Sequence, residues 1–209
     1  MATTNPQSSL SEPATGPSPD LLTGTIENIA SVRDHKLAAR VQQHLDSLTK
    51  PQGSLGRLER VALDYSLATG RADWPLPRKA LFVFCADHGV AAEGVSAFPP
   101  EVTHQMVENF LHSGAAVSVL CRQYDIDPVV VDMGVRHGFE PGLALVDRRI
   151  GPGTRNFLKE PAMSPQQAVR SIESGIRLAT AAAELQYGLL AIGEMGIGNT
   201  TAASAIVAA

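Results

Sequence analysis

Cysteine is scarce in this sequence of 209 residues, which contains two. Two cysteines cannot build the disulfide framework of a small secreted domain, so both are expected to be reduced thiols. No apolar run approaches the ~18 residues that a membrane span requires. The N-terminus also lacks the basic start and apolar stretch of a signal peptide. These absences favour a cytoplasmic protein that has no membrane partner.

The sequence also has fewer basic than acidic residues. Lysine and arginine total 17 against 21 aspartates and glutamates, a net charge of −4, which argues against a nucleic-acid partner. Aromatic residues make up only 5%, while hydrophobic residues reach 44% and glycines number 18. This balance is more typical of helices packed closely on a sheet than of an aromatic-rich β-sandwich.

Motifs for metal ions and for nucleophiles are missing as well. The six histidines show no HExxH pair, the cysteines form no CxxC pair, and no serine lies in a GxSxG turn. We therefore expect no metal site. Cys85 lies inside an apolar segment and is expected to be a core thiol.

The first part of the chain contains two regions. Residues 1–24 are rich in Ser, Thr, Pro and Ala and are predicted to be a disordered leader, because they bury too little apolar surface to offset their ordering entropy. In residues 25–78, apolar positions recur at three- and four-residue steps over 25–48 and again from about residue 54. This pattern predicts an N-terminal helical segment.

Residues 79–209 alternate between short apolar runs and helical patterns, which predicts an α/β domain with a mostly parallel, Rossmann-like sheet flanked by helices. We expect this domain to bind a nucleotide. The predicted strands are 80–85, 128–132, a short one at 143–146, and 189–192; the predicted helices are 101–124, 164–187 and the last residues.

The glycine-rich loop 193–201 lies between a predicted buried strand and a helix start. Glycines there let the backbone approach a ligand, and the helix N-terminus presents free N–H groups to an anion. Asn199 replaces the lysine of a P-loop, and Thr201 replaces the third glycine of a dinucleotide fingerprint. A single phosphate therefore suits this loop better than a triphosphate or pyrophosphate. The alternative is a tight turn that holds no ligand.

Polar residues also gather after the first predicted strand. Asp87, His88 and Gly89 follow it directly, and ligands of open parallel sheets bind beyond the carboxyl ends of strands. Ser96, His104 and Gln105 follow in the same loop and the next helix. The alternative for each of these residues alone is an ordinary structural role, such as capping a turn.

Several stretches occur in an order that resembles one family. They are 48–59 (LTKPQGSLGRLE), 86–90 (ADHGV), 93–96, 101–103, 105–107, 109–110, 114–116, 131–135, 153–157, 161–164 and 193–204 (GEMGIGNTTAAS). The family is that of the nicotinate-nucleotide–dimethylbenzimidazole phosphoribosyltransferases of cobalamin biosynthesis, and the resemblance extends from about residue 26 to residue 209. It implies phosphoribosyl transfer from nicotinate mononucleotide to 5,6-dimethylbenzimidazole, with α-ribazole 5′-phosphate and nicotinate as products. No pyrophosphate leaves, so no metal or other cofactor is expected.

The resemblance also implies roles for individual residues. Glu194 is the catalytic residue expected within this chain, in a supporting role near the ribose. The phosphate is expected near Gly196, Gly198, Asn199, Thr200 and Thr201. Ser96, Phe98 and Gln105 are expected to line the benzimidazole pocket, and Asp87, His88 and Gly89 to shape the same cleft. His104 departs from the family pattern and receives no role.

The family's base is a glutamate near the C-terminal end of its chain, beyond Ala209. The present sequence stops about three turns into its last predicted helix without a terminator, so we expect the N-terminal part of a longer enzyme. The resemblance further implies a homodimer in which the N-terminal helices reach across to the partner. Two alternatives remain at this point: a non-catalytic module that binds a nucleotide monophosphate, and a dimerising fragment with empty loops.

Overall fold

The computed structural model describes residue 10, residues 19–73, residue 75 and residues 77–209. The chain separates into two compact units, one of Ile26–Pro77 and one of Arg78–Ala209 together with the residues up to Thr25. The leader expected over residues 1–24 lies mostly outside the described residues. Within it, Leu10 is fully buried, and helix α2 begins at Pro19 and ends at Asn28, so these positions differ from the expectation.

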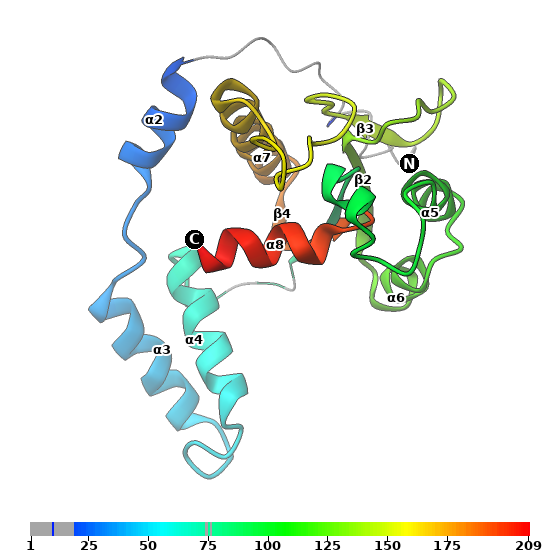
Figure 1. The fold of residues 1–209 in the computed structure, drawn as a ribbon. Helices are drawn as coiled ribbons and strands as arrows, with labels where there is room; N and C mark the ends of the chain where they lie inside the picture. Colours follow the sequence, from blue (N-terminus) through cyan, green and yellow to red (C-terminus); the bar gives the residue numbers. More distant parts are fainter. Residues whose placement is uncertain (1–9, 11–18, 74, 76) are drawn as a thin grey trace. The chain divides into compact units, whose positions relative to one another are not determined.

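The smaller unit is a pair of helices, α3 (His35–Ser47) and α4 (Arg57–Thr69) (Figure 1). The Asp34 carboxylate caps α3 by accepting the first free N–H groups of that helix. This cap explains why the single helix predicted over residues 25–48 is two helices, α2 and α3. Three leucine and valine side chains of α3 are buried against α4: Leu37, Val41 and Leu45.

The loop between α3 and α4 is held by an ion pair. The Lys50 Nζ and Glu59 Oε1 atoms are 2.7 Å apart, and both side chains are largely buried. The Leu55 N–H donates to the same carboxylate oxygen over 3.2 Å. The Lys50 hydrogen bond, followed by that of Leu55, lowers the pKa of Glu59 below its usual range.

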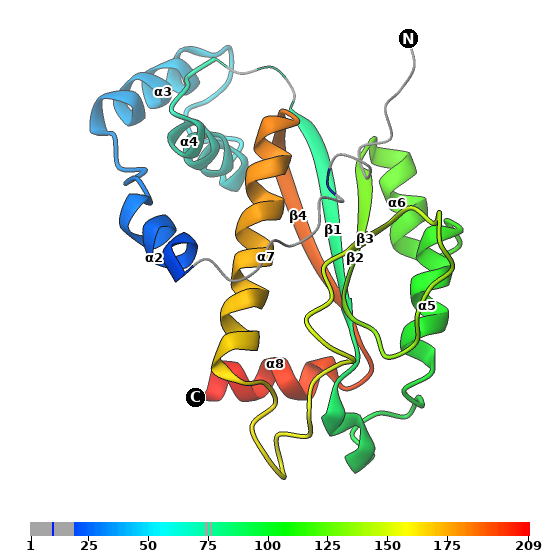
Figure 2. The same cartoon turned by 90° about the horizontal axis from the view of Figure 1, so that it is seen from above.

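The larger unit contains a four-stranded parallel sheet in the order β3-β2-β1-β4. Helices cover both faces: α7 packs on one, and α5 and α6 pack on the other (Figure 2). This arrangement confirms the predicted fold class. The strands are β1 (Arg78–Ala86), β2 (Asp127–Gly134), β3 (Leu145–Asp147) and β4 (Tyr187–Met195), and the helices are α5 (Val102–Leu111), α6 (Ala116–Tyr124), α7 (Pro165–Glu184) and α8 (Asn199–Ala208).

Alternation along the central strands produces two separate cores. Phe82 of β1 and Val129 of β2 pack with Leu178 of α7. Their neighbours Val83 and Val130 point to the other face, where they form a buried cluster with Val107 of α5, Cys85 and Val135. Since successive side chains of a strand point to opposite faces, a continuous apolar run is what a sheet covered on both sides requires.

The single long helix predicted over residues 101–124 is wrong, because the structure has two helices with a break between α5 and α6. Ser113 adopts a left-handed backbone with φ 60°, and the Gly114 N–H donates to the Asn109 carbonyl over 2.9 Å. A left-handed residue ends the helical ladder. The apolar spacing is similar on both sides of the break, so periodicity alone does not reveal it.

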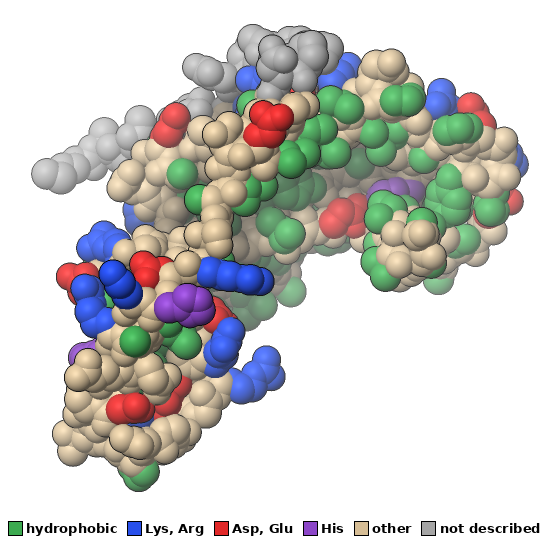
Figure 3. Space-filling model, turned by 90° about the vertical axis from the view of Figure 1, so that its left-hand side faces the viewer, with side chains coloured by type: hydrophobic (Ala, Val, Ile, Leu, Met, Phe, Trp, Pro, Cys, Tyr) green, Lys and Arg blue, Asp and Glu red, His purple; other side chains and the backbone are tan. Residues whose placement is uncertain are grey.

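Strand β4 lies at one edge of the sheet and is exposed over most of its length. Figure 3 shows many apolar side chains gathered on one side of the larger unit. Ile192 of β4 is 80% exposed and Val207 of α8 is 88% exposed, and no residue of α8 is buried. In the part of the chain that the structure describes, no helix has the length and hydropathy to cross a membrane.

Candidate functional site

The sheet topology points to one crevice. Strand β1 pairs with β2 on one side and β4 on the other, so the strand order reverses at the β1–β4 pair. In open parallel sheets, ligands bind at the carboxyl ends of strands beside such a reversal. A cavity of about 830 Å³ lies there, lined by His88 after β1, Glu194 of β4, and residues along the whole of α8 from Asn199 to Ala208.

A carboxylate lies at the mouth of this crevice with both oxygens engaged. Glu194 Oε1 is 3.0 Å from the Nε2 atom of His88, and Glu194 Oε2 accepts a hydrogen bond from the Asn199 side-chain amide. Asn199 Oδ1 in turn accepts the Thr200 N–H over 2.7 Å. The structure therefore joins four residues that the sequence analysis selected from two separate segments.

The glycine loop runs close to the end of β1. A Cβ added to Gly196 would lie 2.2 Å from the Ala86 carbonyl oxygen and 2.7 Å from Cδ2 of the His88 ring. Gly198, immediately before α8, has φ 90°, a conformation that glycine adopts without strain. The first two N–H groups of α8 already have acceptors, since the Asn199 N–H donates to the Gly196 carbonyl over 3.0 Å and the Thr200 N–H donates to the Asn199 side chain. The helix start therefore offers the crevice mainly the positive end of its dipole. Thr201 lies within the same first turn and is partly buried.

Asp87 and Gly89 hold neighbouring loops together. The Asp87 carboxylate is buried and accepts the Arg136 N–H over 2.7 Å. The Asp87 carbonyl accepts the Thr154 N–H over 2.9 Å, and the Gly89 N–H donates to the Thr154 hydroxyl over 3.2 Å. Both residues therefore support the loops around the crevice and do not line the crevice itself.

The three residues expected around the benzimidazole, all of them described by the structure, make no hydrogen bond to Glu194 or His88. Ser96 Oγ accepts the Phe98 N–H over 3.2 Å. The Phe98 side chain is exposed, and Gln105 is exposed on α5. No hydrogen bond among the described residues connects any of the three with Glu194 or His88.

The sequence analysis missed Thr103. Its side chain is fully buried, and its hydroxyl accepts the Ile197 N–H from the middle of the glycine loop over 3.0 Å. Helix α5 is thereby tied to the loop before α8. Thr103 belongs to the matching stretch 101–103, which was its only sequence signal.

The Cys85 thiol and the His104 ring lie in packed surroundings that indicate structural roles. Burial, followed by the nearby charges of Asp132 and Glu194, raises the pKa of Cys85 to about 12, so this thiol stays protonated at neutral pH and is a poor nucleophile. His104 stacks on Phe139 with ring centroids 4.6 Å apart. Among the described residues, no group of three or more His, Cys, Asp or Glu side chains is placed to hold a metal ion.

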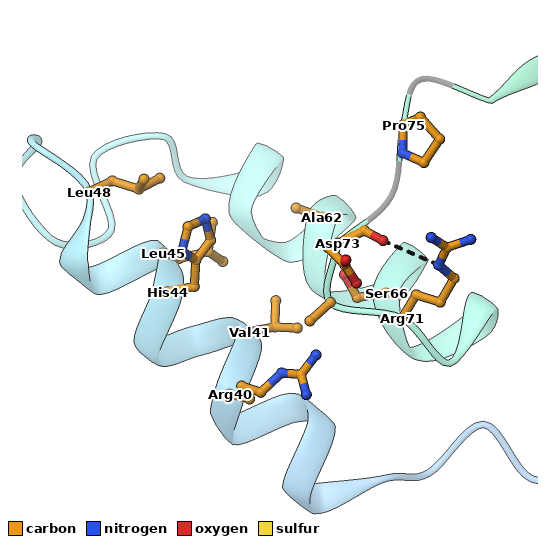
Figure 4. A pocket seen from close by; sticks show the side chains of 11 residues that line it. Arg40, Val41, His44, Leu45, Leu48, Ala62, Ser66, Arg71, Asp73 and Pro75 are labelled. Atoms are coloured by element: carbon orange, nitrogen blue, oxygen red, sulfur yellow. Dashed lines mark hydrogen bonds between the residues drawn. The ribbon is translucent and has the colours of Figure 1, made fainter.

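The smaller unit has a cavity of its own, of about 780 Å³. Figure 4 shows Arg40, His44 and Arg71 around an apolar floor that includes Val41 and Leu45. That cavity lies within the helical pair, whereas the crevice beside β1 and β4 lies at the reversal of the strand order, where ligands of open parallel sheets bind. The crevice is therefore the candidate site.

Comparison with known proteins agrees with the fold and the loops. The chain is 51% identical over 189 residues to the nicotinate-nucleotide–dimethylbenzimidazole phosphoribosyltransferase of Geobacter metallireducens, covering 90% of this chain and 53% of that one. It is 54% identical over 172 residues to the protein of the same name from Pelodictyon phaeoclathratiforme, covering 82% and 49%.

A solved structure is similar as well. The crystal structure of the protein of that name from Thermus thermophilus superposes with a TM-score of 0.80 at 45% identity, over 84% of this chain and 53% of the other. The chain thus spans about half the length of the curated relatives it matches. Residues 30–209 match a family described as "Phosphoribosyltransferase". The chain belongs to this phosphoribosyltransferase family.

Proposed function

We propose that the protein containing these residues transfers phosphoribose from nicotinate mononucleotide to 5,6-dimethylbenzimidazole, in the cytoplasm and as a homodimer. The observation that carries this proposal is the crevice at the β1–β4 reversal, where an oriented carboxylate and a glycine loop meet at the start of α8. The relatives' names supply the substrate class.

The glycine loop would hold the nucleotide phosphate. Gly196 lets the loop pack against the end of β1, and Gly198 supplies the positive-φ turn before α8. The positive dipole end of α8 favours an anion there. Asn199, Thr200 and Thr201 add small polar side chains to the same turn. A ribose attached to that phosphate would then extend towards Glu194.

The chemistry suits a site with an oriented carboxylate and no metal. The bond from the ribose carbon to the pyridinium nitrogen breaks, and its electron pair returns to the ring, so nicotinate leaves without protonation. Positive charge develops on the ribose, as in glycosyl transfer generally, and the Glu194 carboxylate would stabilise it. The benzimidazole nitrogen forms the new bond from the opposite face, and a base takes its N–H proton. In this proposal the base comes from outside the 209 residues.

Calorimetry with three ligands tests the proposal. We expect the chain to bind nicotinate mononucleotide, and to bind nicotinate riboside, which lacks the phosphate, at least tenfold more weakly, a difference of about 1.4 kcal/mol. Dinucleotides are expected to bind more weakly than the mononucleotide. Equal affinity for the mononucleotide and the riboside would contradict the phosphate assignment.

A further inference from the structure

The His88 ring is less accessible than the Glu194 carboxylate that it contacts. The His88 side chain is 15% exposed, whereas that of Glu194 is 41% exposed. Both side chains line the crevice, but the carboxylate is the more exposed of the two, and the His88 Nε2 atom is already directed at Glu194 Oε1 over 3.0 Å.

The ring has little freedom to move. A Cβ on Gly196 would lie 2.7 and 2.8 Å from the Cδ2 and Nε2 atoms of His88, so the ring packs directly on the backbone of the glycine loop. The His88 carbonyl accepts the Ala91 N–H over 3.0 Å, which fixes the main chain at the start of the short helical turn Gly89–Glu93. A partly buried ring that is packed in this way can hold a more exposed partner in one orientation.

Glu194 is bridged between two elements. His88 engages one carboxylate oxygen from the loop after β1, and Asn199 engages the other from the first turn of α8. An exposed glutamate side chain otherwise samples several rotamers, and ordering it costs conformational entropy. Because both oxygens are held before a ligand binds, binding does not have to order the Glu194 side chain.

We propose that His88 is a positioning residue: its Nε2–H holds the Glu194 carboxylate towards the crevice, and the histidine contacts no substrate. This inference deepens the proposed function and rests on it only for the identity of the ligand. It assigns His88 a role different from the cleft-lining role implied by the resemblance.

A spectroscopic experiment on residues 1–209 tests the contact without any ligand. In the ¹⁵N-histidine-labelled chain at neutral pH, we expect a slowly exchanging Nε2–H proton resonance from His88 that disappears in Glu194→Ala. The matched control is Glu108→Ala, which removes the carboxylate 3.4 Å from His104, the other histidine–glutamate pair of the larger unit, and must leave the resonance in place. Absence of the resonance from the unmodified chain, or its survival in Glu194→Ala, would overturn the proposal.

A double-mutant cycle with nicotinate mononucleotide tests the role. We expect His88→Ala to raise Kd at least fivefold, and His88→Gln, whose amide can donate from nearly the same position, to stay within twofold of the unmodified chain. In the Glu194→Ala background, His88→Ala should add less than a twofold loss, because residues that act as a unit are non-additive. Additive losses would mean that the histidine contacts the ligand itself, and would overturn the proposal. Failure of the unmodified chain to bind the nucleotide would instead reject the proposed function, while the resonance experiment still decides the role of His88.

Discussion

Individual glycines determine how closely the loops of the site approach one another. A Cβ on Gly153 would lie 2.8 Å from the Asp87 carbonyl oxygen, and one on Gly89 would lie 2.4 Å from the Arg155 carbonyl carbon. Both distances are well inside van der Waals contact, and both partners are backbone atoms that cannot move aside cheaply. At these positions the absence of a side chain lets the loops that support the site pack backbone against backbone.

The acceptor side of the proposed site is tested by two single substitutions. Ser96→Ala and Gln105→Ala, made in a protein that carries the whole family chain, should raise the KM for dimethylbenzimidazole more than the KM for nicotinate mononucleotide. The reason is that a group contacting one substrate only changes the binding of that substrate. Initial-rate kinetics with each substrate varied in turn measure both constants. An effect confined to the nucleotide would place these residues on the donor side instead.

The Lys50–Glu59 ion pair predicts that the order of the loop between α3 and α4 depends on pH. Because the pKa of Glu59 is lowered in the folded chain, its contribution is present at neutral pH and is lost as pH falls through the folded-state pKa. Hydrogen exchange at the Leu55 amide, which donates to Glu59, should accelerate on acidification, beyond the intrinsic pH dependence of exchange.

Two variants complete this test. In Glu59→Gln the additional acid sensitivity should be absent. Asp64→Asn breaks the exposed Arg60–Asp64 pair and should leave the Leu55 profile unchanged, because exposed pairs contribute little. If Glu59→Gln keeps the original profile, the ion pair is not what orders the loop.

At the scale of the elements, a single hydrogen bond from Ile197 to Thr103 links the glycine loop to α5, so the contribution of this link to stability can be tested by one substitution. Thr103→Val removes the acceptor of the buried Ile197 N–H while keeping the side-chain shape. An unpaired buried donor costs about 1–3 kcal/mol, so the free energy of unfolding in urea should fall by that amount. Thr103→Ser keeps the hydroxyl and serves as the control for the hydrogen bond. Equal stability of the valine variant and the unmodified chain would show that the loop does not depend on this contact.

The sequence predicts those elements whose pattern is local. Strand β1 appears in it as an unbroken apolar run, and α7 as Ser164 followed by Pro165 at the helix start, a cap that the structure contains. The break between α5 and α6 has no such pattern, because it depends on Ser113 adopting a positive φ. The Thr103 contact joins residues 94 positions apart, and a single sequence carries no record of such a pair.

The position of the candidate site was predictable from the order of the strands, but its side-chain contacts were not. The two loops that meet in it follow parallel strands, and parallel strands bring their carboxyl ends to one edge. Which side chains face the crevice and which stand behind it depends on the register between β1 and β4, with Phe84 beside Glu194. That register is fixed by tertiary packing, so the sequence analysis selected both His88 and Glu194, with His88 beside the benzimidazole and Glu194 near the ribose, and did not predict the contact between them.

On the scale of the whole molecule, one edge of the larger unit is unusually apolar. The exposed side chains of β4 and α8 include Leu189, Leu190, Ile192, Ile206 and Val207. Exposed apolar patches of this kind are typical of surfaces that bind further polypeptide, and the relatives have about as much chain again.

This comparison leads to a prediction about turnover. Residues 1–209 alone should form α-ribazole phosphate at least about 10²-fold more slowly than the same residues joined to the second half of a family chain, because general-base assistance is typically worth about 10² to 10⁴ in rate. A chromatographic assay of the product measures both. Turnover by residues 1–209 within tenfold of the joined protein would indicate that a residue of this chain, Glu194 first among them, acts as the base.

The central claim is that the crevice beside β1 and β4 binds a nucleotide through the glycine loop, and Gly198→Val tests it most directly. The substitution places a β-branched side chain at a residue with φ 90° and within 3.4 Å of Val90 and Ala91, where it disturbs the start of α8. Gly138→Val is the matched control, since a Cβ there meets nothing within 4 Å and φ is not positive. In calorimetric titrations with nicotinate mononucleotide, we predict at least a tenfold higher Kd for Gly198→Val, about 1.4 kcal/mol, and an unchanged Kd for Gly138→Val. An unchanged affinity in Gly198→Val would contradict the account.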